Sequence, residues 1–204
     1  MPRRAEPQPA GRDSLIAAAA ERFSRVGFAG ASVGDIAKDA GVTQPLVNHH
    51  FGSKKGLWQA VVHELFGQLE QALGASEARM AGKPERDQLR ELIRTYVTFC
   101  GEHPHLMRML RIEADSELAR EVHQKWQRRF VAFFEGRLAR AIEHRVLAPL
   151  DPQFLFFVVV GAATEIFSQP DLAHRAFQLD VADPTVIRRV ADFVCDFVLK
   201  GASR

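Results

Sequence analysis

The sequence predicts an all-α protein with a small N-terminal helical unit followed by a larger helical domain. Apolar residues recur three and four positions apart along most of the chain, which is the spacing of one helix face. No segment alternates apolar and polar residues as a half-buried strand does, and glycine or proline ends the apolar stripes. With 204 residues, 47% of them hydrophobic and 25% charged, the chain has the length and composition of a globular protein with a sizeable core.

The first predicted helix covers about residues 12–26, and its apolar stripe stops at Gly27, which is expected to end it. The stripe consists of Leu15, Ile16, Ala19, Phe23 and Val26. Residues 1–11 contain three prolines and are predicted to form a disordered tail. The basic start and the apolar residues behind it imitate a signal peptide, but Glu21 and Arg22 cut the apolar run short. We therefore expect a cytoplasmic protein.

Residues 32–51 predict a helix, a glycine-centred turn and a second short helix. Ser32 is placed to cap the first helix, and Gly41 supplies the positive φ that ends it. Thr43 is placed to cap the second helix, with Pro45 in its first turn, where a missing N–H costs nothing. Two helices joined by such a turn are typical of a helix–turn–helix, which presents one helix to the major groove of DNA.

The second short helix has an apolar and a polar side. Val47 and Phe51, four positions apart, are predicted to face the core. The residues predicted to point outward are Gln44, Leu46, Asn48 and His49. Glutamine and asparagine bind the adenine edge, and an apolar side chain contacts the thymine methyl group. For these two helices alone, an ordinary helical hairpin with a solvated polar face explains the pattern about as well.

The flanking segments favour the DNA-binding interpretation. Ser53 is placed to cap a third helix, with Lys54 and Lys55 beside its N-terminus, which itself attracts phosphate. From residue 12 to about residue 62 the chain resembles the tetracycline-repressor (TetR) family of transcriptional regulators. The resemblance rests on Phe23, Gly27, Phe28, Ser32, Ile36, Ala37, Ala40, Gly41, Val42, His50, Phe51, Ser53, Lys54 and Leu57.

The resemblance implies a DNA-binding domain at residues 12–56 and a helical effector-binding and dimerisation domain at residues 57–204. It implies a ligand-responsive regulator, most often a repressor, that binds a palindromic operator as a homodimer and is released by a small-molecule effector. The DNA contacts expected on this basis are Ser32, Thr43, Gln44, Pro45, Leu46, Asn48, His49, His50, Lys54 and Lys55. The family commonly has two tyrosines where this chain has Asn48 and His49, so the resemblance implies no operator sequence.

The C-terminal domain is predicted to be wholly helical. Apolar stripes at helical spacing predict helices at about residues 57–78, 89–101 and 117–145, with a short helix after Pro104. Two further helices begin with aspartate followed by proline, at Asp151 and Asp183. Residues 154–163 are all apolar or glycine, a run too short to span a membrane, so both sides of this helix need covering. We expect a homodimer that uses Phe154, Val158, Gly161, Ala162, Val190, Val194 and Phe197.

Most of the fifteen phenylalanines lie beyond residue 98, which indicates an interior able to surround an apolar or aromatic effector. The candidate pocket residues are Phe99, Arg108, Arg111, Trp126, Phe130, Phe134, Phe157, Thr164 and Glu165. For each aromatic residue the alternative is simple core packing, and for the polar residues it is a salt bridge between helices.

An enzyme or a metal-binding protein is the other class to consider, as is a scaffold protein whose helix–turn–helix serves packing only. The residues that would form a nucleophile or metal cluster are Cys100, His103, His105, Glu113 and His123. Their spacing lacks the paired ligands of a typical zinc site, and the chain has no glycine-rich phosphate loop. We therefore expect no catalytic residue, no metal and no cofactor.

Overall fold

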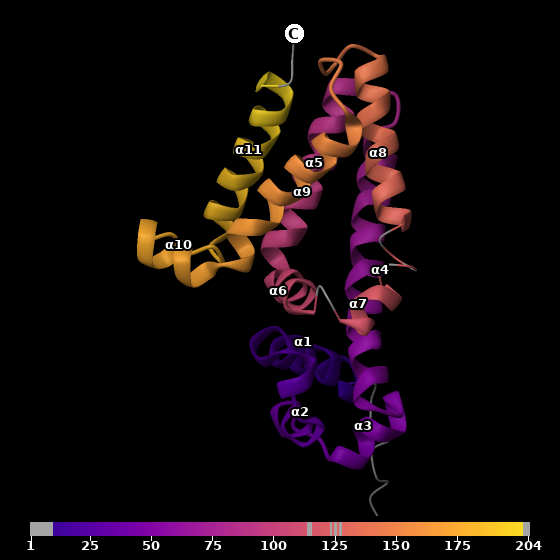
Figure 1. Cartoon of the computed structure of the whole chain (residues 1–204), viewed down its shortest axis with the longest axis vertical. Helices are drawn as coiled ribbons and strands as arrows, with labels where there is room; N and C mark the ends of the chain where they lie inside the picture. Colours follow the sequence, from indigo (N-terminus) through magenta and orange to yellow (C-terminus); the bar gives the residue numbers. More distant parts are fainter. Residues whose placement is uncertain (1–9, 114–115, 123, 125, 127, 202–204) are drawn as a thin grey trace, which may run out of the picture.

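The structure is a computed structural model that describes residues 10–113, 116–122, 124, 126 and 128–201. Within these residues every regular element is a helix, as predicted. The elements form a small lower unit, made by the first three helices, and a larger upper unit (Figure 1). The long helix α4 begins in the lower unit and continues into the upper one (Figure 1).

The lower unit contains α1 (Ala10–Gly30), α2 (Val33–Asp39) and α3 (Gln44–Phe51). Helix α1 begins two residues before the predicted boundary, and the rest of the predicted tail lies outside the described residues. Gly27 breaks α1 as predicted, with φ 71° and ψ 176°, a conformation that glycine adopts at little cost. The helices enclose a shared core of Leu15, Phe23, Ile36, Val47 and Leu57, each at most 1% exposed.

The upper unit is built from the remaining helices. They are α4 (Lys54–Met80), α5 (Glu85–Glu102), α6 (Pro104–Ile112), α7 (Glu117–Val122), α8 (Arg128–Glu143), α9 (Pro152–Ser168), α10 (Pro170–Phe177) and α11 (Pro184–Gly201). Asp151 and Asp183 cap α9 and α11 as predicted, because their carboxylates accept hydrogen bonds from Gln153 N (2.8 Å) and Thr185 N (2.7 Å). Each bond satisfies an N–H that the helix itself leaves without a partner.

One expectation for this unit was wrong, and one helix was missed. The single helix expected at residues 117–145 is divided into α7 and α8, and Gln124 and Trp126, described between them, lie in a wider π-type helical turn. Helix α10 was not predicted, although Pro170 and Asp171 are typical of a helix start. No single helix in the described part of the chain has the length and apolar composition of a membrane span. Helices α9 and α10 have that length and composition only when they are taken together, and they are bent by 77° at the break between them.

The two units meet where α1 packs on α6. The carboxylate of Glu113, just after α6, accepts a hydrogen bond from the backbone N–H of Phe28 (2.7 Å), the residue that follows the break in α1. Nearby, Ser24 Oγ lies 3.0 Å from His105 Nδ1 and 2.7 Å from the carbonyl oxygen of Glu21. The single hydroxyl proton goes to that carbonyl, so the imidazole donates to Ser24. The bonds of His105 and Glu113 thus join both ends of α6 to the last turns of α1.

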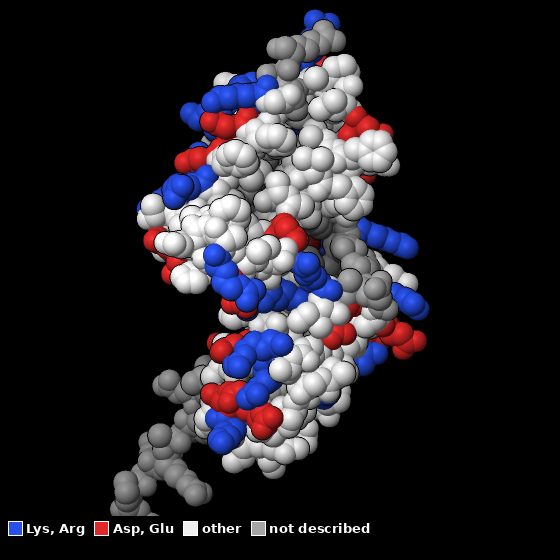
Figure 2. All heavy atoms as spheres, turned by 60° about the vertical axis from the view of Figure 1, so that its left-hand side comes forward, with Lys and Arg blue, Asp and Glu red and all other residues white. Residues whose placement is uncertain are grey.

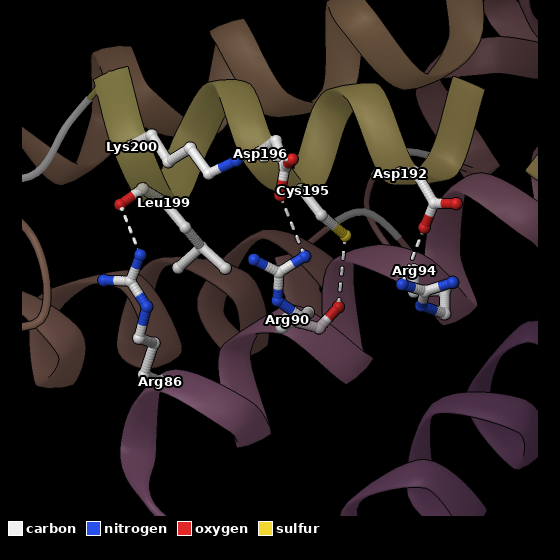
Figure 3. A network of polar contacts seen from close by, with 8 residues as sticks. All are labelled: Arg86, Arg90, Arg94, Asp192, Cys195, Asp196, Leu199 and Lys200. Carbon is white, nitrogen blue, oxygen red and sulfur yellow. Dashed lines mark hydrogen bonds and ion pairs between the residues drawn. The ribbon is translucent and has the colours of Figure 1, made fainter. Parts of the chain in front are cut away.

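A ladder of arginines fastens α11 to α5 (Figure 3). Arg90 pairs with Asp196 at 3.0 Å, Arg94 pairs with Asp192 at 2.7 Å, and Arg86 donates to the carbonyl oxygen of Leu199 at 3.1 Å. Beyond the ladder, the backbone of α5 at Gly101 approaches α11 so closely that a Cβ there would lie 2.8 Å from Ile187. The ladder and this contact set which side of α11 faces away from the protomer.

Candidate nucleic-acid interface

The turn between α2 and α3 is held by short-range hydrogen bonds that the sequence predicts. Ser32 Oγ accepts from Asp35 N (3.4 Å) at the start of α2. Gly41 has a φ of 70°, and Val42 N donates to the carbonyl oxygen of Ala37 (2.9 Å). Thr43 occupies the capping position of α3, but its side chain makes no capping bond, so its predicted capping hydrogen bond is absent. The backbone thus places α3 rigidly against α2.

Helix α3 has the two sides that the sequence predicts. Val47 is fully buried and Phe51 packs against the core. Gln44, Pro45, Asn48, His49 and His50 are exposed. Leu46 is only partly exposed, because it lies beside Gly11 at the start of α1. The exposed side therefore offers amide and imidazole groups to a partner.

Both lysines that were expected to meet phosphate already have protein partners. Lys54 Nζ donates to the carbonyl oxygens of Ala31 (2.9 Å) and Ala29 (3.4 Å) and lies 4.6 Å from the ring centre of Phe28. It therefore binds the C-terminal end of α1, where cations are favoured, and an ammonium keeps one further N–H. Lys55 pairs with Glu121 of α7 at 2.6 Å, and this bond lowers the pKa of the Glu121 carboxyl below its usual range.

Replacing Lys54 with alanine is expected to lower the free energy of unfolding by about 1–3 kcal/mol, because the carbonyls of Ala29 and Ala31 lose a charged donor. Urea denaturation measures the loss. Lys55→Ala is the matched control: its ion pair with Glu121 is exposed, so little stability should be lost. Equal losses for the two variants would contradict the structural role assigned to Lys54.

Helices α9 and α11 carry large apolar side chains that the described part of the protomer leaves exposed. The exposed fractions are 73% for Phe154, 71% for Phe157, 70% for Phe193 and 53% for Phe197. Figure 2 shows a broad face of the upper unit with few charged side chains. An apolar surface of this kind is typical of a protein–protein interface.

One of the residues expected at a dimer interface, Val194, is contradicted by this geometry. Val194 is only 1% exposed and belongs to the protomer core, because it lies on the side of α11 that faces the rest of the protomer. Val190 is partly buried, whereas Val158, Gly161 and Ala162 are exposed as expected. Phe193 stacks on Phe197 with ring centres 6.3 Å apart. It is exposed as well, but it was not among the interface residues predicted from the sequence. The pattern of α11 contained the signal, since Phe193 and Phe197 are four positions apart.

A cavity of about 300 Å³ lies between α4 and α8, at the lower end of the usual size for small-molecule sites. It brings together two of the predicted residues, Trp126 and Phe130. Residues that the sequence did not single out complete the lining: Phe66, Leu69, Glu70, Leu73, Gly74, Glu77, Arg129 and Phe133. Trp126 stacks on Phe66 with ring centres 5.8 Å apart. The cavity is thus an aromatic slot with charged groups at its edge.

The other pocket candidates lie elsewhere. Phe157 is on the exposed apolar face, Phe99 packs against His103, and Phe134 is buried among aromatic rings that include Tyr96. None of these three lines the α4–α8 cavity.

The polar candidates have structural partners or lie in a different region. Thr164 Oγ1 donates to the carbonyl oxygen of Val160 (2.9 Å) within α9. Arg111 and Glu165 form an ion pair between α6 and α9 at 3.2 Å. Arg108 lies in a separate hollow beside α1. The α4–α8 cavity contains none of these side chains.

The structure does not assemble the alternative nucleophile or metal cluster from its described members. Cys100 is buried and faces Tyr96, His105 binds Ser24, and Glu113 binds the backbone of Phe28. His123 lies outside the described residues. Across the described residues, no three His, Cys, Asp or Glu side chains are placed to hold a metal ion.

Both cysteines are expected to resist alkylation in the folded protein. Burial raises the pKa of the Cys100 thiol to about 12 and that of Cys195 to about 11. At about pH 8 the reactive thiolate fraction is then on the order of 0.1% or less. Mass spectrometry after iodoacetamide treatment should show no adduct until the chain is unfolded in urea. Rapid modification of either thiol in the folded state would contradict this assignment.

Two family models match the chain. The model described as bacterial regulatory proteins of the tetR family matches residues 15–61. The model described as the tetracyclin repressor-like C-terminal domain matches residues 81–203, more than half of the chain.

Similar proteins are transcriptional regulators by name. The regulator BetI of Stenotrophomonas maltophilia is 37% identical over 86 residues, which is 42% of this chain and 43% of that protein. YttP of Bacillus subtilis, described as a probable regulator of the same helix–turn–helix type, is 28% identical over 113 residues, or 54% of this chain and 55% of its own. The chain thus matches only about half the length of these relatives.

Solved structures share the fold over nearly the whole chain. The ketosteroid transcriptional regulator KstR2 of Mycobacterium tuberculosis superposes with a TM-score of 0.77, at 17% identity over 99% of this chain and 100% of that one. FadR of Bacillus subtilis, solved in complex with stearoyl-CoA, superposes with a TM-score of 0.68, at 16% identity over 93% and 98% of the two chains. At such identities the superpositions establish the fold.

Proposed function

The chain belongs to the TetR family of bacterial transcriptional regulators, and we propose from this premise that it is a repressor released from a palindromic operator by a small-molecule effector. We propose the division suggested by the sequence, with DNA binding in residues 12–56 and effector binding and dimerisation in residues 57–204. The observation that carries the proposal is the exposed polar side of α3, held rigidly by α2 and the start of α4.

The chemistry of that side supports base reading. Gln44 and Asn48 are exposed one turn apart on α3, and each carries an amide that pairs with adenine through two hydrogen bonds. His49 and His50 are exposed beside them and are suited to phosphate or base edges. Lys54 keeps one N–H beyond its two carbonyl bonds, which leaves it able to contact a phosphate as well.

The exposed apolar face of α9 and α11 supports a homodimer. A two-fold axis would bring this face of one protomer against the same face of its partner and cover Phe154, Phe157, Phe193 and Phe197. The dimer would then carry two copies of α3. Recognition helices spaced about 34–36 Å apart read two successive major grooves of a palindrome.

The α4–α8 cavity supports an apolar or aromatic effector. Its aromatic lining, including Trp126 and Phe130, suits an apolar body, while Glu70 and Arg129 at its edge suit a polar end. The FadR structure with stearoyl-CoA is a protein of the same fold with an acyl compound bound. An effector that wedges α8 away from α4 would tilt α4, whose first turn adjoins α3, so the two α3 helices would no longer match the groove spacing.

The proposal is tested by selecting duplexes from a random pool with the purified protein and then titrating the best duplex in a gel-shift assay. The expected result is a palindromic consensus bound by two protomers. Apolar metabolites are then screened for release of the duplex, with Phe130→Trp as a variant that fills the cavity and should lose the response while keeping DNA affinity. Failure to enrich any sequence would contradict the proposed function. If the same metabolite concentration released the duplex from the wild type and from Phe130→Trp, the proposed effector site would be contradicted.

A further inference from the structure

A second hollow, of about 620 Å³, lies where α1 meets α6, the end of α9 and the start of α10. It shares no lining residue with the α4–α8 cavity. Its charged lining residues are Arg25, Arg108, Arg111, Arg175 and Asp171. Figure 2 shows lysine and arginine side chains gathered at the level where the upper unit meets the lower one. Two of the arginines are paired with carboxylates beside the hollow, Arg25 with Glu21 at 4.0 Å and Arg111 with Glu165 at 3.2 Å. The excess of positive charge in the hollow therefore comes from Arg108 and Arg175.

Arg108 has an incomplete set of hydrogen bonds. Its Nε is buried and has no hydrogen-bond acceptor among the described residues. A buried guanidinium N–H without an acceptor is costly, because it has lost water and gained nothing in return. Arg111, one turn of α6 away, differs in this respect, since Glu165 and Ser168 accept its hydrogen bonds at 3.2 and 3.0 Å. In this conformation the Nε is out of contact with the hollow, so an anion there would bind Arg108 after its guanidinium turns toward the space, and would then supply the acceptor that the Nε lacks.

Helix α10 contributes a second attraction for an anion. Its first turn lines the hollow through Pro170, Asp171 and Leu172. The first N–H groups of a helix have no acceptor within that helix and carry partial positive charge. The Asp171 carboxylate opposes this attraction but is a single charge, and it is exposed. Guanidinium groups and a helix start converging on one space are the recurring features of sites for phosphate and carboxylate groups.

We propose that this hollow binds a small molecule with two or more anionic phosphate or carboxylate groups. The volume favours such a molecule over a single inorganic ion, because it falls in the range of small-molecule sites. Ser24 and Arg25 belong to α1 of the lower unit, whereas the remaining lining residues belong to the upper unit. The bound anion therefore joins the two units at the same junction as the bond between Phe28 and Glu113. This goes beyond the proposed effector in the α4–α8 cavity.

Isothermal titration calorimetry of the whole protein with inorganic pyrophosphate, and separately with citrate, tests the proposal at constant ionic strength set with chloride. One saturable site per protomer is expected. Arg108→Gln should weaken binding at least about tenfold, the loss of one charge-assisted bond. Arg175→Gln, at an exposed position on α10, should weaken it as well without disturbing the core. Arg188→Gln is the matched control, because Arg188 is an exposed arginine of α11 outside the hollow.

Each outcome decides the matter. Binding of pyrophosphate alone supports a phosphate ligand, and binding of citrate alone supports a carboxylate ligand. Absence of saturable binding for both up to about 10 mM, the range of very weak sites, overturns the proposal. So does an equal loss of affinity in Arg188→Gln and Arg175→Gln, since it would show attraction by overall charge only. Because no DNA is present, the result is independent of whether the proposed regulatory function holds.

Discussion

Substitution of Phe157 by aspartate is expected to convert the proposed dimer to a monomer. Phe157 is 71% exposed in the protomer, and in the proposed dimer the partner covers it. Covering a phenylalanine side chain is worth about 1.5–3 kcal/mol, and a two-fold interface contains each contact twice. The aspartate would also be buried without a partner, which costs further free energy. The dimer dissociation constant should therefore rise at least about a thousandfold, as measured by analytical ultracentrifugation.

The same substitution should leave the protomer intact, because the side chain contributes little to its own core. Circular dichroism and the urea midpoint measured on monomeric samples should match those of the wild type. Affinity for a palindromic duplex should fall steeply, since the two recognition helices are no longer tethered to each other. Phe177→Asp is the matched control, because Phe177 is 73% exposed but lies on α10. A Phe157→Asp protein that remains dimeric would refute the α9–α11 interface.

The sequence was sufficient for features that depend on a few neighbouring residues. Ser32, Gly41, Ser53 and Asp151 act at helix ends as predicted, because caps and left-handed turns depend on residues within about one helical turn. The burial of Val47 followed from helical spacing in the same way. Local chemistry thus predicts the helix–turn–helix well.

Features that depend on packing between distant segments could not be predicted in this way. Phe157 and Phe134 look alike in the sequence, yet one is exposed and the other buried. Phe134 lies on α8 and Phe157 on α9. The difference depends on which side of each helix faces the rest of the protomer, and these two residues alone do not contain that information. Lys54 was expected to face DNA because a helix start attracts phosphate, but the carbonyls at the end of α1 are a closer partner. The pairing of α4 with α8 around the cavity could not be predicted from the sequence either.

Replacing Asn48 with alanine is expected to reduce the preference for the selected operator over random DNA by about 30-fold to 20,000-fold. The estimate follows from about 1–3 kcal/mol for each amide–base pair, taken twice in a dimer on a palindrome. Asn48 is exposed and supports no core contact, so the free energy of unfolding should change by less than about 0.5 kcal/mol. Competition gel-shift titrations with operator and random duplexes measure the ratio.

A change of charge distinguishes base reading from general attraction to DNA. Lys38 is exposed on α2 within the same unit, and any loss of affinity in Lys38→Ala should fall equally on both duplexes, because phosphates carry no sequence information. Its effect should also diminish at higher salt, whereas the lost discrimination of Asn48→Ala should persist. If Asn48→Ala instead weakened operator and random DNA by the same factor, α3 would hold the backbone without reading bases, and the specificity of this protein would have to come from another segment or from the shape of the duplex.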